Sequence, residues 1–472
     1  MRVRYPEGVE GANGPPEKRT RERFKSGSKA LVQNLRGPLF KLRQKHKLSM
    51  LKVNSFATTD YRGQGKVFGI KREDRRLHMY VIGKTGMGKS ALLTNIALND
   101  IYAGEGLCFI DPHGQAVEQL LDYIPHSRVE DVIYFNPADL EYPISMNVLE
   151  DVAPARRHLL VSGIISIFRK LYAEHWQHRQ EHILRNALYT LLELENGATL
   201  IEMYHLLVDW RYRKSLVANV QDPIIRAFWA HEFPKYVYQY KGEALAPIQN
   251  KLGAFLTAPL IRNIVGQRRC SINFRSVIDE GKILLVNLAK GKLGEDNAAF
   301  LGSLIIMKLQ LAALSRADVP EDERRDFYLT VDEFQTFAAS NAQGLDDILS
   351  EARKYRLSLT LAHQYIGQLD ERVRQAILGN VGTVISFAIG AEDADLLERE
   401  FLPAFNRGDL TGQGRYHIYI KLAIDGKTSP PFSAMTLSPF VHFIPQGTRQ
   451  YIVERSRQQY STALTEVVKE IG

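Results

Sequence analysis

A glycine-rich loop with a lysine and a hydroxyl residue at fixed spacing is the part of the chain best suited to chemistry. It runs from Gly83 to Ser90 and matches the pattern G-x-x-x-x-G-K-[ST] at every fixed position. Glycines in such a loop let backbone N–H groups close around phosphate oxygens, where a Cβ would block the approach. A short apolar run precedes the loop and an amphipathic helical pattern follows it. The sequence therefore predicts a nucleotide site; the alternative is a glycine-rich turn without a nucleotide.

Two side chains of this loop have expected tasks. The ammonium of Lys89 would reach the β and γ phosphates, and the Ser90 hydroxyl would be a ligand for Mg²⁺. The helix that follows would point its positive end at the anion. ATP and Mg²⁺ are thus the predicted cofactors. The predicted cofactor-binding residues are Gly83, Lys84, Thr85, Gly86, Met87, Gly88, Lys89, Ser90 and Ala91.

Phosphoryl transfer also needs a carboxylate for the metal and a group that positions the attacking water. Of four Asp-Glu pairs, Asp332-Glu333 closes the apolar run FYLTV, which predicts a place at the carboxyl end of a strand beside the loop. Asp332 would organise Mg²⁺ through water and Glu333 would polarise the attacking water. The pair at 279–280 would sit at the wrong end of the sheet, and the pairs at 322–323 and 370–371 lie in polar surroundings. The alternative for 332–333 is two exposed carboxylates that end a strand.

Three further residues are candidates near the same site. Asp111 also ends an apolar run but lacks a following Glu, so we expect it to line the nucleotide region without acting as the catalytic acid. Gln364 follows an apolar run and could hydrogen-bond the γ-phosphate or its water. Arg353 lies just before that run and could complete the site of a neighbouring subunit in a ring. Taken alone, Gln364 and Arg353 would each also fit an ordinary surface residue.

These residues need a sheet to position them, and strand patterns alternate with helical ones from about residue 66. Several strand candidates are continuously apolar, as parallel strands covered on both faces are. The alternation predicts a doubly wound α/β domain. The candidate strands are 77–82, 106–111, 131–136, 282–288, 326–333, 357–363, 381–390 and 415–424.

The chain is expected to divide into five parts. Residues 1–60 would form a largely irregular arm, and residues 1–52 carry 14 Lys/Arg against 4 Asp/Glu. This basic excess fits DNA phosphates, an anionic membrane surface or a solvated tail. The other parts are a first half of the α/β domain at 61–150, an inserted all-α domain at 151–280, the second half of the α/β domain at 281–445 and a helical tail at 446–472.

Composition narrows the class of protein. The two cysteines, Cys108 and Cys270, have no metal or disulfide spacing, which favours a reducing compartment. The longest apolar stretch that we recognise, at 159–168, is too short to cross a bilayer, so no transmembrane segment is expected. These features predict a cytoplasmic protein, with peripheral attachment at the inner face of the cell membrane as a further option. The motif H-x-x-E-H at 178–182 suits a zinc helix, but no third ligand is apparent.

The ordered motifs together resemble those of the type IV secretion coupling proteins of conjugation, the TraG/TraD group. They are similar, more distantly, to those of HerA and FtsK translocases. The resemblance spans about residues 60–440 and rests on the phosphate loop, IDPHG, YLTVDEFQTF, LSEARKYRLSLTLAHQ and GNVGTVISFAIGAEDADLL. Many members of this group begin with transmembrane helices, which are not expected here.

The resemblance implies a RecA-like P-loop NTPase sheet with an inserted all-α domain, assembled as a homo-hexamer that moves DNA by ATP hydrolysis. It implies type IV secretion channel or relaxosome proteins as partners. By position, Lys89 and Ser90 match the Walker A pair, and Asp332 and Glu333 match Walker B. Gln364 matches the glutamine of the third motif and Arg353 the arginine finger. Two alternative functions stay open: a HerA-like motor that works with a nuclease, and a nucleotide-switched module that recruits protein cargo.

Overall fold

The computed structural model describes residues 53–60, 63, 65–150, 152–171, 176–194, 197–238, 243–337 and 348–471. Residues from Lys52 onward form one compact unit. Residues 1–52 lie outside the described residues. The three interpretations of their basic excess, DNA, an anionic membrane surface and a solvated tail, therefore stay predictions. The end of the predicted arm differs from expectation, because Val53–Thr59 is a strand, β1, which joins the main sheet. Its alternating buried and half-buried side chains explain why it pairs there.

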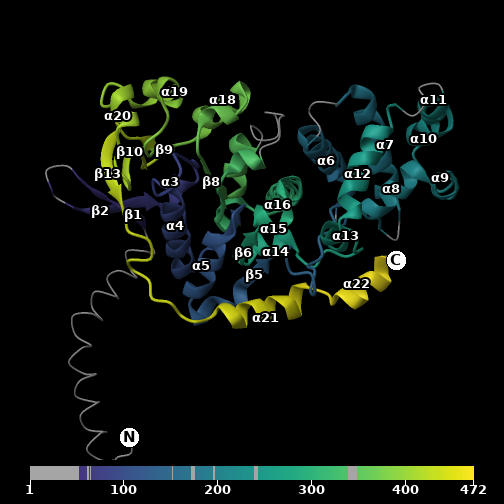
Figure 1. The fold of residues 1–472 in the computed structure, drawn as a ribbon, viewed down its shortest axis with the longest axis horizontal. Coiled ribbons are helices and arrows are strands. Elements are labelled where there is room, and N and C mark those ends of the chain that lie inside the picture. Colours follow the sequence, from purple (N-terminus) through teal and green to yellow (C-terminus); the bar gives the residue numbers. More distant parts are fainter. Residues whose placement is uncertain are drawn as a thin grey trace, which may run out of the picture. The chain divides into compact units, whose positions relative to one another are not determined.

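Within the described residues, eleven strands form one sheet in the order β2-β1-β13-β10-β9-β3-β8-β7-β4-β6-β5 (Figure 1). The strands from β9 to β5 pair in parallel. The strands from β2 to β10 extend the sheet in antiparallel pairs. The bounds are β1 Val53–Thr59, β2 Val67–Lys71, β3 Met79–Ile82, β4 Gly106–Asp111, β5 Val132–Phe135, β6 Ile283–Asn287, β7 Phe327–Val331, β8 Leu357–His363, β9 Thr383–Ser386, β10 His417–Lys421 and β13 Phe432–Thr436; β11 Ala423–Ile424 and β12 Lys427–Thr428 form a separate hairpin.

The parallel strands are the ones that the sequence predicts most clearly. Every residue of β3, β4, β6, β7 and β8 is buried, as expected of strands with helices on both faces. The strands β1, β2 and β13 were not predicted, because half-exposed antiparallel strands near a sheet edge carry fewer apolar residues. The predicted α/β class with a helical insertion is confirmed.

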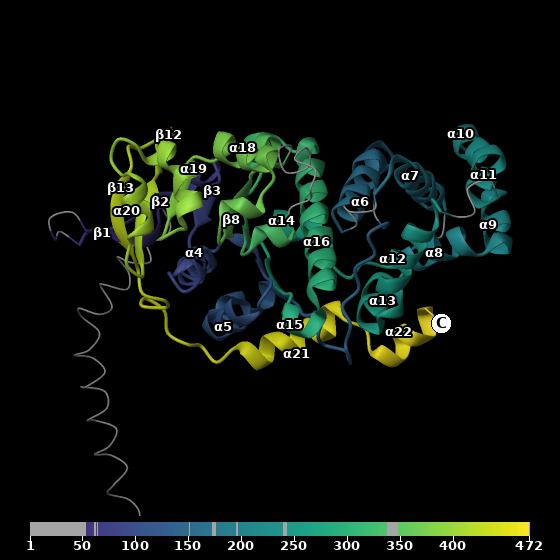
Figure 2. The ribbon, with the colours of Figure 1, turned by 45° about the horizontal axis from the view of Figure 1, so that its top comes forward.

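Helices cover the sheet and separate it from the insertion. Helix α16 stands between the sheet and the helices of the insertion in both views (Figures 1 and 2). The helices outside the insertion are α3 Arg72–Arg75, α4 Lys89–Ala103, α5 Gln115–Tyr123, α14 Phe274–Asp279, α15 Lys290–Leu293, α16 Glu295–Ser315, α18 Glu371–Asn380, α19 Ala391–Phe401, α20 Arg407–Thr411, α21 Arg449–Tyr460 and α22 Leu464–Ile471.

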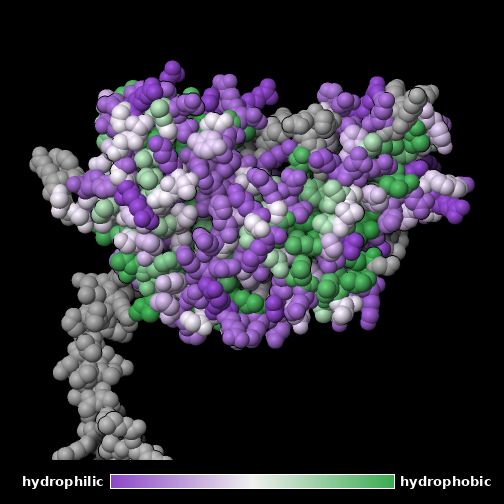
Figure 3. Space-filling view, viewed as in Figure 1, coloured by the Kyte–Doolittle hydropathy of each residue, from purple (hydrophilic) through white to green (hydrophobic). Residues whose placement is uncertain are grey.

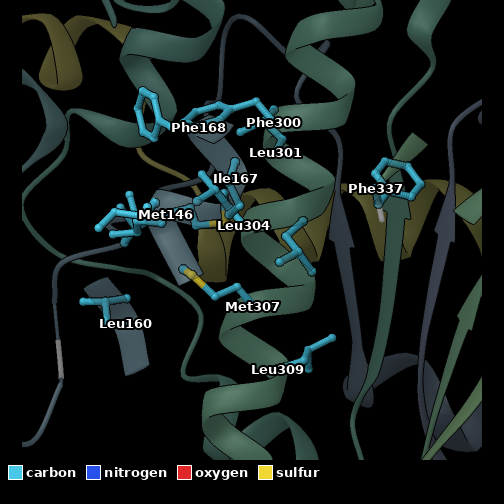
Figure 4. Packing of buried hydrophobic residues seen from close by; sticks show 14 of the residues in the cluster. Met146, Leu160, Ile167, Phe168, Phe300, Leu301, Leu304, Met307, Leu309 and Phe337 are labelled. Carbon is cyan, nitrogen blue, oxygen red and sulfur yellow. The ribbon is translucent and has the colours of Figure 1, made fainter. Parts of the chain in front are cut away.

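After an irregular segment that follows β5, the described residues from Pro154 to Val265 form helices and their connecting turns. Buried aromatic and aliphatic side chains of α6 pack on α16, among them Phe168 against Phe300 (Figure 4). This contact makes the insertion continuous with the hydrophobic core of the sheet layer. The helices are α6 Arg157–Leu171, α7 His178–Leu192, α8 Leu200–Val208, α9 Trp210–Val217, α10 Pro223–Ala227, the π-helical turn Phe228–Glu232, α11 Phe233–Tyr238, α12 Ala246–Thr257 and α13 Pro259–Val265.

The longest apolar helix was not recognised in the sequence. Among the described residues, Glu295–Asp318 is the one helical segment with the length and composition of a membrane span. Its most apolar window is 72% buried inside the protein, between the sheet and α6. The expectation that no stretch approaches this length was wrong, and the physical reason for the apolar composition is burial on several sides of the helix.

Candidate nucleotide site

Three adjacent parallel strands bring the predicted site residues together. Strand β8 pairs with β3 on one side and with β7 on the other. Their carboxyl ends carry the phosphate loop after β3, Gln364 after β8 and Asp332-Glu333 after β7. Since parallel strands end at the same edge, residues far apart in the sequence meet there. The acidic pair therefore lies on the same edge as the phosphate loop, as predicted.

The protein's own packing requires two glycines of the loop. A Cβ on Gly83 would lie 2.5 Å from the Cβ of Phe387, at the end of β9. Gly88 has a φ of +121°, and a Cβ there would lie 2.6 Å from the Tyr416 ring. Gly88 also precedes α4, whose first residue is Lys89. Glycine is thus needed both to let phosphate approach and to seat the loop against neighbouring strands.

Lys89 lies buried inside the loop. Its Nζ donates to the carbonyl oxygen of Gly83 at 2.5 Å and of Lys84 at 3.3 Å. Burial lowers the pKa of Lys89, and the charges of Asp332 and Glu333 oppose that shift. The Lys89 ammonium is therefore attracted by both carboxylates. Its hydrogen bonds to the two loop carbonyl oxygens would be replaced by bonds to phosphate oxygens when a nucleotide binds.

Ser90 and Asp332 form the centre expected for a metal. The Ser90 Oγ donates to Asp332 Oδ2 at 3.1 Å. Burial raises the pKa of Asp332 to about 6, and the negative charges of Asp111 and Glu333 add to the shift. A hydroxyl and a carboxylate are hard oxygen ligands of the kind that Mg²⁺ takes, and a divalent cation would relieve this crowding of negative charge. The residues present fit a bound Mg²⁺.

Glu333 is held in place by two amide side chains. Gln364 Nε2 donates to its Oε1 at 2.7 Å, and Gln335 Nε2 donates to its Oε2 at 2.6 Å. Its backbone has a φ of +47°, a left-handed conformation that is uncommon for a residue with a side chain. Backbone strain at a non-glycine residue persists where the surroundings hold it, often at functional sites. Both carboxylate oxygens are therefore oriented within the protein.

Asp111 has a structural task that sequence reasoning did not anticipate. Its carboxylate accepts from the backbone N–H of His113 at 2.8 Å and of Ala116 at 2.8 Å, at the start of α5. It also lies close enough to raise the pKa of Asp332. The expected role beside the nucleotide remains a prediction, and the bonds to α5 explain an aspartate at the end of β4.

Arg353 lies at the amino end of β8, which is the end of the parallel strands opposite to the phosphate loop. It is exposed in a short 3₁₀ turn, Ala352–Tyr355, just before β8 begins. Its charge contributes to lowering the pKa of the buried His78, which precedes the amino end of β3. The seven residues of β8 separate it from Gln364, a span of about 23 Å at about 3.3 Å per residue. Arg353 is therefore not brought to the phosphate loop of its own chain.

Two residues at the site were missed in the sequence. Gln335 follows the acidic pair in FQTF, and a polar residue two positions after Glu333 was the available signal. Lys170 donates to the carbonyl oxygens of Gln335 and Thr336 from the end of α6. The sequence offers no signal for Lys170, because the contact joins elements 165 residues apart.

The H-x-x-E-H segment forms the start of α7, and the side chains of Glu181 and His182 have other partners. Glu181 pairs with Arg169 and Arg185, and His182 with Glu232 at 2.9 Å. Across the described residues, no group of three or more His, Cys, Asp or Glu side chains could hold a metal ion. The segment thus acts in this structure as part of a charged helix surface.

Solved structures with the same fold include two of the plasmid coupling protein TrwB. The unbound form of bacterial conjugative coupling protein TrwB is 15% identical, with a TM-score of 0.59 over 80% of this chain and 88% of that one. TrwB in complex with ADP and Mg²⁺ is 16% identical, with a TM-score of 0.59 over 81% and 90%. VirB4 of Thermoanaerobacter pseudethanolicus is 16% identical, with a TM-score of 0.57 over 81% and 95%. At these identities the likeness is one of fold.

A curated relative and a family model add the sequence evidence. The type 4 coupling protein DotL of Legionella pneumophila is 20% identical over an alignment of 362 residues, and the match covers 64% of this chain and 46% of DotL. The chain thus spans less than half the length of that relative. The family model described as "Type IV secretion-system coupling protein DNA-binding domain" matches residues 64–399. The predicted resemblance is confirmed: the chain belongs to the type IV secretion-system coupling protein DNA-binding domain family.

Proposed function

We propose that this chain is an ATP-hydrolysing motor that moves DNA for type IV secretion or conjugative transfer. The observation that carries the proposal is the contact of Ser90 Oγ with Asp332 Oδ2 at 3.1 Å, which joins the phosphate loop to the acidic pair. Family membership and the complex of TrwB with ADP and Mg²⁺ support ATP and Mg²⁺ as the ligands here. We place the protein in the cytoplasm, in association with a type IV secretion system.

Each residue of the site has a proposed role. Lys89 and the N–H groups from Gly83 to Ala91 would bind the phosphates, and Ser90 and Asp332 would hold Mg²⁺. The metal would neutralise charge on the phosphate oxygens when bound. Glu333, oriented by its two amide partners, would take the proton of the attacking water.

Gln364 and Arg353 would serve the same reaction from different subunits. Gln364 lies between the loop and Glu333, because Thr85 Oγ1 donates to its Oε1 at 2.9 Å. Arg353, exposed at the other edge, would reach the γ-phosphate of a neighbouring subunit. This arrangement supports a homo-hexameric ring, in which each site is completed by the next chain. Such a ring would carry DNA through its centre.

The test measures the ATPase rate with no DNA, with single-stranded DNA and with double-stranded DNA, alongside particle images of the protein. We expect hydrolysis that DNA stimulates, and hexameric rings. An absence of hydrolysis in the wild type would contradict a motor, and equal rates with and without DNA would contradict DNA as the cargo. Neighbouring genes separate a conjugative motor from a HerA-like motor with a nuclease, since the motor itself would be the same.

A second function is favoured by one surface feature. Large apolar side chains are exposed on the insertion, with Trp210 60%, Ile224 75% and Tyr238 80% exposed. On the face shown in Figure 3, hydrophobic areas gather over the insertion, whereas the helices that cover the sheet are mostly hydrophilic. Exposed apolar side chains in one region suit a protein partner. If the chain recruits protein cargo instead, a cargo protein added to the ATPase assay should stimulate hydrolysis, whereas DNA should bind weakly and leave the rate unchanged.

A further inference from the structure

Lys170 joins the helical insertion to the turn that follows Glu333. It is the second-last residue of α6, and its Nζ donates to the carbonyl oxygen of Gln335 at 3.0 Å and to that of Thr336. The same Gln335 uses its side-chain amide to hold Glu333 Oε2 at 2.6 Å. Gln335 thus accepts a hydrogen bond from the insertion through its carbonyl oxygen and donates one to Glu333 through its side-chain amide.

The turn is short and held from two helices. It consists of the 3₁₀ turn Phe334–Thr336 and begins at Glu333, with its left-handed backbone. On its far side, Ser303 of α16 donates to the carbonyl oxygen of Phe337 at 3.2 Å. The Phe337 ring lies against Gly302, where a Cβ would come within 2.3 Å of it. Helix α16 thus holds Phe337 at one end of the turn. Lys170 holds the carbonyl groups of the two residues before it, Gln335 and Thr336.

The position of Lys170 follows the position of α6. Ile167 and Phe168, in the turn of helix before it, are buried in the core between α6 and α16 (Figure 4). Packed cores move as units and do not deform continuously. A displacement of α6 would therefore move the ammonium and, with it, the carbonyl groups of Gln335 and Thr336.

Stability alone does not explain a lysine at this place. Burial lowers the pKa of Lys170 to about 7, so the protein bears a cost for holding the charged form there. The contacts in question are to carbonyl oxygens, which offset less of that cost than a carboxylate would. Lys170 is half-buried, and an apolar side chain of similar length would fill the same space without this cost, at the loss of the two hydrogen bonds to the turn.

We propose that Lys170 is a positioning residue for ATP hydrolysis, which holds the turn after Glu333 so that Gln335 orients the Glu333 carboxylate. The inference rests on the proposed function, in which Glu333 activates the attacking water. It also names a route by which a partner bound to the insertion would regulate hydrolysis. A shift of α6 would change the catalytic rate constant without touching the nucleotide.

The test compares DNA-free ATPase kinetics of Lys170→Met and Lys170→Arg with wild type. We expect kcat to fall about ten- to a hundredfold in Lys170→Met, with KM for ATP within about twofold and a melting temperature at or above that of wild type. Lys170→Arg keeps a charge and its donors, so it should recover part of kcat. Lys235→Met, the same change at an exposed lysine of α11 in the insertion, should behave as wild type. If the melting temperature of Lys170→Met is below that of wild type, Lys170→Gln is used in its place for the kinetic comparison.

A double-mutant cycle with Gln335→Ala separates positioning from a general structural role. If Lys170 acts through Gln335, adding Lys170→Met to Gln335→Ala should lower kcat little further, because coupled residues are not additive. Additive losses, or equal kcat for the Met and Arg variants, would overturn the inference. Glu333→Gln is measured in parallel: if it retains wild-type activity, the proposed function has failed, and if it is inactive while Lys170→Met is fully active, only this inference has.

Discussion

Gln364 Nε2 donates to Glu333 Oε1 at 2.7 Å, although the two residues end different strands and lie 31 positions apart. Thr85 of the phosphate loop donates to the other end of the same amide at 2.9 Å. A continuous path of hydrogen bonds thus runs from the loop through Gln364 to Glu333. In the proposed function, a bound phosphate that displaces Thr85 or Gln364 would alter the hydrogen bond to the Glu333 carboxylate and so couple nucleotide binding to hydrolysis.

Glu333→Gln should stop hydrolysis and leave nucleotide binding intact. The amide keeps the shape of the side chain but cannot accept a proton, so kcat should fall about a hundredfold or more. Affinity for ATP, measured with a fluorescent analogue, should change by less than about threefold, whereas Lys89→Ala should lose both. Glu323→Gln, at an exposed position just before β7, is the matched control. A Glu333→Gln enzyme with more than a tenth of wild-type kcat would exclude the proposed base.

Gln364→Ala should lower kcat about tenfold and leave the affinity for ADP unchanged. The substitution removes one of the two amides that orient Glu333, and it cuts the path to Thr85. The ADP affinity should persist, because the phosphate loop itself is intact. Steady-state kinetics and ADP titration check this, with Gln368→Ala as a control on the exposed turn that follows. Equal loss of ADP binding and of kcat would show that Gln364 supports the fold of the loop instead.

Asp332→Asn should stabilise the nucleotide-free protein while removing Mg²⁺-dependent hydrolysis. The pKa of Asp332 is raised to about 6 in the fold, so the ionised carboxylate costs stability as pH rises from about 4 through 6. Above pH 6 the amide should therefore raise the free energy of unfolding by about 1–3 kcal/mol, and below pH 4 the two proteins should unfold alike. Thermal melts from pH 4 to 8 check the sign, with exposed Asp322→Asn as a control.

The same carboxyl predicts an acid limit to activity. Mg²⁺ binding needs the ionised form of Asp332, so kcat/KM for Mg²⁺–ATP, which reports the groups of the free enzyme, should decline in the wild type as pH falls through about 6. Since the charge of Asp111 contributes to that raised pKa in the nucleotide-free protein, Asp111→Asn should move the acid limb of the kcat/KM profile to lower pH. If the acid limb lies at the same pH in Asp111→Asn as in the wild type, a group other than Asp332 causes the decline.

Arg353→Ala should act on the neighbouring subunit. The variant should bind ATP normally and hydrolyse it at least about a thousandfold more slowly, the magnitude typical of an arginine finger. Mixed with Lys89→Ala subunits, which keep Arg353, it should regain activity at the interfaces where an intact loop faces an intact arginine. Lys354→Ala, at the exposed neighbouring position, should keep wild-type kcat. Failure of the mixture to exceed either variant alone would contradict a finger that acts between subunits.

Much of the fold and of the candidate site could be predicted because the signals are local. The phosphate loop is contiguous in the sequence, and the apolar runs that become β3, β7 and β8 are long enough to be read as buried strands. Asp332 and Glu333 stand out because a carboxylate pair directly follows such a run. The antiparallel strands β1, β2 and β13 could not be predicted, since half-exposed strands depend on their neighbours for pairing.

The candidate site residues and the α/β alternation that carries them could be read from the sequence without a structure. The place of Asp332 beside the phosphate loop was also predicted, but the hydrogen bonds made there, from Ser90 to Asp332 and from Gln364 to Glu333, follow only from the tertiary structure. The tertiary structure also decided that Asp111 accepts hydrogen bonds at the start of α5, that Arg353 lies far from the phosphate loop of its own chain, and that Lys170 contacts the turn after Glu333. The physical reason is that strand order and helix packing bring distant segments together by burying shared apolar surface, and no local pattern records which segments will meet.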